Sequence, residues 1–424
     1  MYKLTKIIAA SIAVPILLGS HVAFAASKKE VLNHYSDIAY AKYGDSVKTA
    51  KVLQKAIGTL IEKPVPANLE AAKKAWKDAR VPYQQTEVYR FGNAIVDDWE
   101  GKVNAWPLDE GLIDYVASSY GSTSDENSLY TANVIANKSI TLSGKTIDTS
   151  VITKTLLSET LHEVDGVEAN VATGYHAIEF LLWGQDLNGT GEGAGARPVT
   201  DYDVSNCSSG NCDRRGEYLK VVTELLIDDL EWMHKQWNKD GAARQVLLKD
   251  EDAGITSILT GLGSLSYGEL AGERIKLGVL LHDPEEEHDC FSDNTHNSHF
   301  YDILGMQNVY TGNYTSVDGK VLSGPSISDL IKKKESSIDQ NIQAELKKSL
   351  SAANVLVVSS EQDGIAYDQL LAEGNTEGNK KILNVVDALL KQTLSFEKAV
   401  AILGISPIEF EGSDSLDAPK NVFQ

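Results

Sequence analysis

The chain is 424 residues long, and its 60 acidic side chains outnumber its 39 basic ones, which gives a formal net charge of -21. This excess of negative charge argues against nucleic acid and anionic lipid surfaces as partners. A single hydrophobic core rarely extends beyond about 250 to 300 residues, so we expect two domains or two halves of one repeated plan.

The N-terminus has the pattern of a secretory signal. Lys3 and Lys6 precede an apolar stretch over residues 7–18, and the small-x-small triplet Ala23-Phe24-Ala25 follows it. We predict a signal peptide over residues 1–25. The apolar stretch is too short for a comfortable membrane span, and no later segment is apolar for long enough. We therefore expect an exported protein with no transmembrane segment after signal cleavage.

Helical spacing of apolar side chains dominates the remaining sequence. It predicts helices over residues 28–62, 68–91, 147–163, 169–182, 213–237, 255–281, 327–350 and 380–403, with shorter ones near 112–115 and 367–371. Pro82 lies inside the second of these helices, where we expect a kink or a break. Irregular segments are expected over residues 92–109, 118–143, 184–211 and 282–326.

The fold class follows from this pattern. Alternation of apolar and polar residues, which is typical of half-buried strands, is not evident, and residues 355–358 are the one candidate for a buried strand. The predicted class is all-α. Both halves pair long helices with an irregular acidic and aromatic segment, which suggests a duplication. We place the N-terminal helical half at 26–205 and the C-terminal helical half at 206–424.

Three cysteines are too few for a disulfide scaffold. In an oxidising compartment Cys207 and Cys212 can form a local disulfide, which leaves Cys290 over. The paired spacings of a cysteine zinc site are missing. We interpret the cysteines as structural.

The segment 174–186 is mostly apolar, and His176 and Glu179 interrupt it. Three positions apart on a helix, the two side chains lie on one face. They can bind one metal ion together if other helices supply one or two more ligands. The alternative is a buried histidine that is hydrogen-bonded to the carboxylate and binds no metal.

Other polar residues could complete or extend such a site. The carboxylates considered as further ligands are Glu87, Asp109, Glu110, Glu273 and Asp302. The acidic, histidine-rich segment 285–302 could hold a second metal ion such as calcium, but an ordered loop that bonds its own backbone is the favoured interpretation. Trp99, Trp106 and Trp183 are interpreted as packing residues.

A zinc peptidase of the common type places two histidines at i and i+4 with a glutamate between them. The HExxH pattern is missing from this sequence. A peptidase would have to use His176 and Glu179 as part of its zinc ligand set, together with an unidentified general base. Catalysis is therefore the more demanding hypothesis.

Several stretches together resemble a known family. Gly174, His176 and Glu179 match the motif GxHxxE, and similar stretches are RVPYQQTEVYRFG at 80–92, VNAWPLDEGLIDYV at 103–116, GARPVTDY at 195–202 and GERIKLG at 272–278, followed by HDCFSDNTHNSHFYDILGMQNVYTG from His288. These stretches extend over most of the chain. The sequence resembles the imelysin-like proteins of the M75 peptidase class, and within them the iron-regulated protein A branch.

The resemblance implies a bacterial envelope protein of two four-helix-bundle-like halves with a cleft between them, located in the periplasm or associated with the outer membrane. It implies that His176 and Glu179 bind a metal ion between the halves, with iron as the first expectation and zinc as the second. Glu87 is our candidate for a third ligand, and Arg80 is expected to orient a carboxylate. The expected surroundings of this site are Tyr83, Asp109, Glu110, Gly174, Glu273 and Arg274.

The leading functional hypothesis is binding of iron, or of an iron-carrying ligand, for bacterial iron uptake, together with an envelope iron-uptake partner. The alternative is a zinc-dependent metallopeptidase that uses the same His/Glu pair, although the missing HExxH pattern disfavours an active protease. A third hypothesis is a surface-interaction protein in which the pair is only structural.

Overall fold

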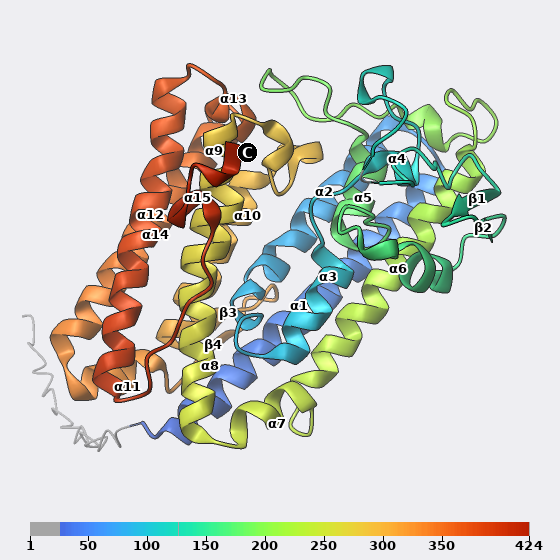
Figure 1. Ribbon diagram of the computed structural model, residues 1–424. Helices are drawn as coiled ribbons and strands as arrows, with labels where there is room; N and C mark the ends of the chain where they lie inside the picture. The colour runs from blue at the N-terminus through green and yellow to red at the C-terminus, as the bar shows by residue number, and fades with distance from the viewer. Residues whose placement is uncertain (1–25, 126, 424) are drawn as a thin grey trace, which may run out of the picture.

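The computed structural model describes residues 26–125 and 127–423, so the predicted signal peptide lies outside the described residues. Helices dominate the structure, which confirms the all-α class (Figure 1). The longer helices are α1 (Lys28–Glu62), α2 (Pro66–Gln84), α3 (Ala94–Asn104), α5 (Gly174–Trp183), α6 (Cys212–Gln236), α8 (Glu251–Ser264), α10 (Thr295–Thr311), α12 (Ser336–Glu361) and α14 (Thr376–Leu403). The shorter ones are α4 (Glu110–Ile113), α7 (Ala242–Leu248), α9 (Leu277–Leu281), α11 (Ile327–Lys334), α13 (Tyr367–Leu371) and α15 (Asp414–Asp417).

The first bundle is built on α1, whose bounds match the predicted range. Its N-terminus is fixed by Ser27 and Glu30, since each side chain bonds to the other residue's backbone N–H. The buried face of α1 packs against α2 and α6, and α5 packs against the same two helices. Figure 1 shows these elements together in one half of the molecule.

The helix α6 begins beyond the expected division between residues 205 and 206, yet it packs in the first bundle with α1 and α5. A disulfide between Cys207 and Cys212 fixes its N-terminus, as predicted, and Cys290 is free and buried. The first bundle therefore draws helices from both sides of the expected division. The duplication of the two halves stays a prediction.

The second bundle contains α10, α12 and α14 together with a continuous helical segment that starts at α8. Between α8 and α9 this segment is π-helical over Leu265–Lys276, where we had expected uninterrupted α-helix. A π-helical stretch widens the helix locally and is often found at functional sites. Here it includes Glu269 and Arg274, which face the other bundle and pair with its side chains.

The two bundles meet where α10 lies against α2 (Figure 1). Gly305 of α10 permits the close approach, because a Cβ atom at this position would lie 2.7 Å from the carbonyl oxygen of Gln85. The buried Nζ of Lys42 donates hydrogen bonds to the carbonyl oxygens of Gln85 at 2.8 Å and Gly305 at 3.4 Å. The contact between the bundles is therefore tight and polar.

Several predicted elements were wrong or incomplete. The helix α2 continues through Pro82 and ends at Gln84, so the hydrogen bond that proline cannot donate falls in the last turn. Helices α3 and α10 lie in segments that we had expected to be irregular. Their buried faces carry polar side chains such as Glu100, His296 and His299, so hydrophobic spacing does not reveal them.

Two short hairpins also differ from the prediction. Strands β1 (Ser139–Leu142) and β2 (Lys145–Asp148) pair antiparallel, as do β3 (Asn313–Thr315) and β4 (Val321–Ser323). The predicted helix over 147–163 is replaced by β2 and a single π-helical turn over Leu156–Leu161. Residues 355–358, the strand candidate, lie within α12. Strands of three or four residues are too short to display a period.

The predicted helix over 327–350 is divided into α11 and α12 at Glu335. Across residues 26–125 and 127–423, none of the helices combines the length and hydropathy needed to cross a membrane.

Candidate metal centre

The candidate centre is built around α5, all ten residues of which are buried. This helix starts at Gly174, whose φ of +79° favours glycine. A Cβ atom there would also lie 2.5 Å from the carbonyl oxygen of Val103 near the end of α3. Gly174 therefore allows the first turn of α5 to lie against α3, which places His176 beside the junction of the two bundles.

His176 and Glu179 form a buried pair, as the spacing predicts. The Nδ1 atom of His176 lies 2.9 Å from Oε2 of Glu179. The other oxygen, Oε1, accepts a hydrogen bond from the backbone N–H of Ser292 at 3.0 Å. Both carboxylate oxygens are thus engaged, whereas Nε2 of His176 has no hydrogen-bond partner among the described residues. Buried polar atoms without partners are uncommon in native structures and need an explanation.

His288 and Asp289 lie opposite this imidazole. One ligand atom each from His176, His288 and Asp289 lies within 4.8 Å of the other two, and all three residues are buried. The ring centroids of His176 and His288 are 4.9 Å apart. Within the described ranges this is the one group of three or more potential ligands that meets this spacing. We refer to His176, His288 and Asp289 as the metal cluster.

Asp289 is held by three side chains from both bundles. Arg80 of α2 donates from Nη2 to Oδ1 at 2.7 Å, while Asn294 and Ser298 donate to Oδ2. Burial raises the pKa of Asp289, but the positive charge of Arg80 and these hydrogen bonds outweigh burial and lower it to about 2. The carboxylate is therefore charged at neutral pH, and its orientation is fixed.

The two imidazoles are held neutral. Burial lowers the pKa of His176 well below its usual range, and the positive charges of Arg80 and Arg274 lower it further. Burial and Arg274 have the same effect on His288. Burial and Asp289 raise the pKa of Glu179. When the proton that His176 and Glu179 share lies on Nδ1, Nε2 offers a lone pair, which is the form that binds metal.

Aromatic rings and an amide complete the surroundings. The Trp106 ring centroid lies 5.0 Å from that of His176 and 5.6 Å from that of Phe291. On the other side, Asn104 Nδ2 lies 3.2 Å from His288 Nε2, and its Oδ1 accepts a hydrogen bond from Arg80. Trp106 was predicted to be a packing residue, and it packs here directly on the cluster.

Glu87, the predicted third ligand, lies outside the metal cluster. Its Oε2 accepts a hydrogen bond from Nη2 of Arg274 at 2.6 Å and lies 3.5 Å from Nη1 of Arg90. Glu269 contacts the same two arginines, at 2.8 Å from Arg274 Nε and 3.1 Å from Arg90 Nη1. We call Glu87, Arg90, Glu269 and Arg274 the ion network. Asp302, another ligand candidate, contacts Arg274 Nη1 at 3.2 Å.

The remaining predicted residues are dispersed. Asp109 accepts a hydrogen bond from Asn127, and Glu110 from Gln185 at 3.4 Å, so both are committed to loop contacts of the first bundle. The buried ring of Tyr83 packs against that of Tyr175 at a tilt of 45°, with centroids 4.8 Å apart. Glu273 is exposed and lines a cavity that reaches the cluster.

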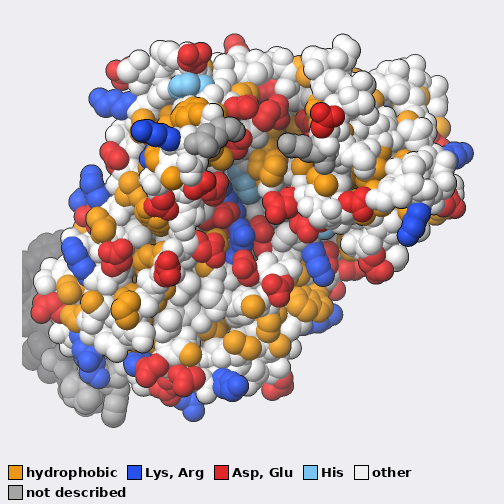
Figure 2. Space-filling model, in the orientation of Figure 1, with side chains coloured by type: hydrophobic (Ala, Val, Ile, Leu, Met, Phe, Trp, Pro, Cys, Tyr) orange, Lys and Arg blue, Asp and Glu red, His pale blue; other side chains and the backbone are white. Residues whose placement is uncertain are grey.

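That cavity has a volume of about 480 Å³ and lies between the bundles. His288, Asn104 and Trp106 line it, together with Arg90 and Arg274 of the ion network. Six of its lining residues are glutamates: Glu100, Glu163, Glu168, Glu269, Glu273 and Glu286. Figure 2 shows a hollow between the two halves of the molecule, rimmed by acidic side chains, with basic and histidine side chains inside it.

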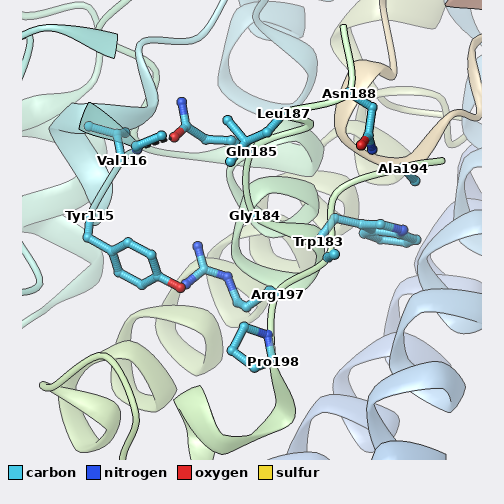
Figure 3. A pocket seen from close by; sticks show the side chains of 12 residues that line it. Tyr115, Val116, Trp183, Gly184, Gln185, Leu187, Asn188, Ala194, Arg197 and Pro198 are labelled. Carbon is cyan, nitrogen blue, oxygen red and sulfur yellow. Dashed lines mark hydrogen bonds between the residues drawn. The ribbon is translucent and has the colours of Figure 1, made fainter. Parts of the chain in front are cut away.

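A separate pocket of about 270 Å³ lies at the other end of α5 (Figure 3). Tyr115, Gln185 and Arg197 line it, and Gln185 accepts a hydrogen bond from the backbone N–H of Ala117 at 2.6 Å. Arg197 is engaged by Asp114 at 2.8 Å and Asp201 at 3.2 Å. From His176 to Trp183 is about 10 Å along the helix axis, so this pocket is distinct from the metal cluster.

Sequence reasoning missed His288 and Asp289 as partners of His176. Both lie in the acidic, histidine-rich segment 285–302, which we had interpreted as an ordered loop. The available signal was the adjacent His-Asp pair at the start of a stretch rich in hydrogen-bonding side chains. Contact with α5, more than a hundred residues earlier, depends on how the bundles pack.

Comparisons with known proteins agree with this fold. A sequence profile of the family Imelysin (Peptidase_M75) matches residues 39–396. Iron-regulated protein A of Synechococcus elongatus is 42% identical over 64 residues, which cover 15% of this chain and 18% of that protein. The match to this curated relative therefore spans less than a fifth of its length.

Two solved structures share the fold. A Parabacteroides distasonis protein, assigned as an iron-regulated protein A precursor, has a TM-score of 0.63 at 17% identity, covering 89% of this chain and 95% of its own. An imelysin-like protein of Psychrobacter arcticum has a TM-score of 0.57 at 13% identity, covering 95% of this chain and 100% of its own. The family profile extends over most of the sequence, and the chain belongs to the imelysin family.

Proposed function

We propose that this protein binds an iron ion at the metal cluster and carries it in bacterial iron uptake. The observation that carries the proposal is the buried Nε2 atom of His176, which lacks a partner among the described residues and lies beside His288 and Asp289. Metal binding would satisfy this atom. The iron assignment is supported by family membership and by the similarity to a relative named iron-regulated protein A.

The donor set fits ferrous iron. Two histidines and one carboxylate are the ligands by which many proteins hold Fe(II), with further positions left open. Zinc also accepts nitrogen and oxygen ligands, so it is the expected competitor. In this proposal iron is cargo, and the protein's own residues bind and orient it.

Glu179 takes a different role from the one the sequence suggested. Its carboxylate meets Nδ1 of His176 at 2.9 Å and the N–H of Ser292 at 3.0 Å. A carboxylate on the far ring nitrogen of a metal-binding histidine sets the tautomer and increases the basicity of the ligand. We therefore assign Glu179 to orienting His176, and Asp289 to direct metal binding.

The acidic cavity provides a path for a cation. Its glutamates outnumber the two arginines that line it, and His288 lies at its wall. A cleft lined mainly by one sign of charge raises the local concentration of the opposite ion. Export, a place in the periplasm or at the outer membrane, and an envelope partner remain parts of the proposal that rest on the predicted signal peptide and the family.

The zinc-peptidase alternative uses the pair of His176 and Glu179, and it stays a prediction. It needs a general base near the metal, and in our proposal Glu179 instead orients His176. Among the described residues, no observation favours a peptidase over a protein that binds the metal without catalysis.

Calorimetric titration of metal-free protein with Fe(II) under anaerobic conditions, and separately with Zn(II), tests the proposal. We expect one ion per chain and a loss of affinity of at least about a hundredfold in His176→Ala, since one of three ligands is removed. The matched control is His234→Ala, which removes a half-buried histidine of α6 that stacks on Tyr40. Equal affinity in wild type and His176→Ala would overturn the proposal.

A further inference from the structure

A second cavity lies on the Arg80 side of the metal cluster, between α2 and the start of α10. Its volume is about 340 Å³. Lys77, Arg80 and Gln84 of α2 line one wall, and Asn297 and Ser298 of α10 line the other. This cavity is distinct from the acidic one, with which it shares none of its lining residues.

Gln84 gives this cavity an unfilled capacity for hydrogen bonds. The side chain is fully buried, and neither its Nε2 nor its Oε1 has a partner among the described residues. Arg80 also has one such atom. Its buried Nε lacks a partner among the described residues, while Nη1 and Nη2 bond to Asn104 and Asp289. Leaving such buried groups without hydrogen-bond partners is unfavourable, so a polar ligand is the expected complement.

Three basic side chains, Lys74, Lys77 and Arg80, and two acidic ones, Asp78 and Glu361, line the cavity. Of the two lining acids, Asp78 is paired with Lys74 at 2.6 Å, and Glu361 accepts hydrogen bonds from His296 and Asn297, each at 3.1 Å. Lys77 has no carboxylate partner within 4 Å in the part of the chain that the structure describes. Its ammonium group lies 5.9 Å from the Trp183 ring centroid. One lysine is therefore available to a ligand.

The helix α10 adds to this field. Its N-cap residue Asn294 and its first-turn residues Asn297 and Ser298 line the cavity. The N-terminus of a helix carries a partial positive charge and backbone N–H groups that lack partners within the helix. The N-terminus of α10, a 17-residue helix, lies at the wall of the cavity and adds positive potential there.

We propose that this cavity binds a small oxyanion, such as phosphate or a small carboxylate. Arg80 Nε, Gln84 Nε2 and Lys77 supply the donors, and Gln84 Oε1 accepts from a hydroxyl group of the ligand. The volume suits an anion of this size with a few water molecules. No residue of the metal cluster itself is needed for the anion to bind.

The anion site is placed to influence the metal cluster through Arg80. The Nη2 atom of Arg80 contacts Asp289 at 2.7 Å, and the same residue lines the cavity. An anion on that side offsets a positive charge that otherwise repels a cation at the cluster. We therefore expect anion and metal to strengthen each other's binding by the same factor. This coupling rests on the proposed function, whereas the anion site does not.

Titration of the metal-free protein with inorganic phosphate, and separately with citrate, tests the site. Gln84→Met keeps the shape of the side chain and removes its hydrogen-bonding atoms, and Lys77→Gln removes the available charge. We expect at least one of the two anions to bind, and each variant to lose about tenfold in affinity. The control is Lys51→Gln, which removes an exposed lysine paired with Glu231 elsewhere on the molecule.

The outcomes separate the two proposals. If neither anion binds, or if both variants bind as tightly as the control, the anion site is overturned. Thermal unfolding of each variant shows whether it is folded. If Gln84→Met does not fold, Lys77→Gln still tests the site. Repetition with saturating Zn(II) measures the coupling. If the anion binds and no metal does, the metal proposal fails and the anion site stands.

Discussion

The metal cluster and the ion network are two buried groups of charged and polar side chains at the same junction between the bundles. They differ in whether every polar atom has a hydrogen-bond or ion-pair partner. In the ion network, Arg274 and Arg90 both contact Glu87 and Glu269. In the metal cluster, Arg80 and two hydrogen-bond donors fix Asp289, but Nε2 of His176 has no partner among the described residues. Buried charge alone therefore does not mark a binding site. Our proposal is that an unfilled ligand position among fixed neighbours marks one.

The largest expected effect is the loss of stability in a variant that breaks the ion network. Arg274→Gln leaves Glu87, Glu269 and Asp302 facing one another with less positive charge. Removing one partner of a buried ion pair costs about 3 to 5 kcal/mol, so urea unfolding of the metal-free protein should show a loss of this size. The control is Lys154→Gln, whose exposed pair with Asp228 contributes at most about 1 kcal/mol. Equal losses in the two variants would contradict a stabilising network.

His299 of α10 sharpens the comparison, because both of its ring nitrogens are buried without partners among the described residues, yet it does not belong to the metal cluster. Burial, with Arg274 nearby, lowers its pKa to about 3, while Asp289 acts in the opposite direction. The unfolded chain takes up a proton near pH 6.5 and the folded one does not, so stability is lost as pH falls.

Between pH 7 and pH 5 this linkage amounts to about 2 kcal/mol. His299→Phe, which keeps a planar ring, should therefore lose about 2 kcal/mol less than wild type over this interval in urea unfolding of metal-free protein. Contributions from other groups cancel in the difference. Parallel pH profiles for the two proteins would show that His299 titrates normally in the folded state.

Glu179→Gln tests the orienting role in the metal cluster. The amide keeps the size of the side chain but no longer presents a carboxylate to Nδ1 of His176. Loss of such a partner usually costs 10- to 100-fold in metal affinity, and one ion per chain should still bind in calorimetry. The control is Glu273→Gln in the exposed wall of the acidic cavity. Unchanged metal affinity in Glu179→Gln would contradict the orienting role of Glu179.

The smallest expected effect concerns Glu87, which the sequence suggested as a third ligand. In the structure it is bound by Arg274 and shares no direct partner with His176. Effects of residues without shared partners combine nearly independently, so Glu87→Gln should change iron affinity by about twofold or less. A tenfold loss would show that Glu87 binds the metal and that the two regions are not separate.

The sequence predicted the parts of the fold in which apolar spacing decides the structure. Examples are α1 and α13, whose bounds match the predictions, and the local disulfide between Cys207 and Cys212. It did not reveal α10, because His296, Ser298 and His299 are buried in that helix among polar neighbours. Where a helix faces a polar cleft, the apolar period is lost while the helix remains.

The candidate site shows the same division. His176 and Glu179 are three residues apart on α5, so their contact is local and could be predicted. Asp289 reaches His176 only because a loop of the second bundle lies against α5 through Phe291 and Ser292. Spacing along the chain cannot supply such long-range contacts. Nor can spacing show that Arg274 donates a hydrogen bond to the carboxylate of Glu87.

Anomalous diffraction from crystals soaked in Fe(II) tests the central claim most directly. We expect one peak at about 2.0 to 2.2 Å from Nε2 of His176, which is the usual distance for a metal bound to histidine, with ligand atoms of His288 and Asp289 also in its coordination shell. A peak on the carboxylate of Glu87, or full iron occupancy at a position that does not contact His176, would contradict the account.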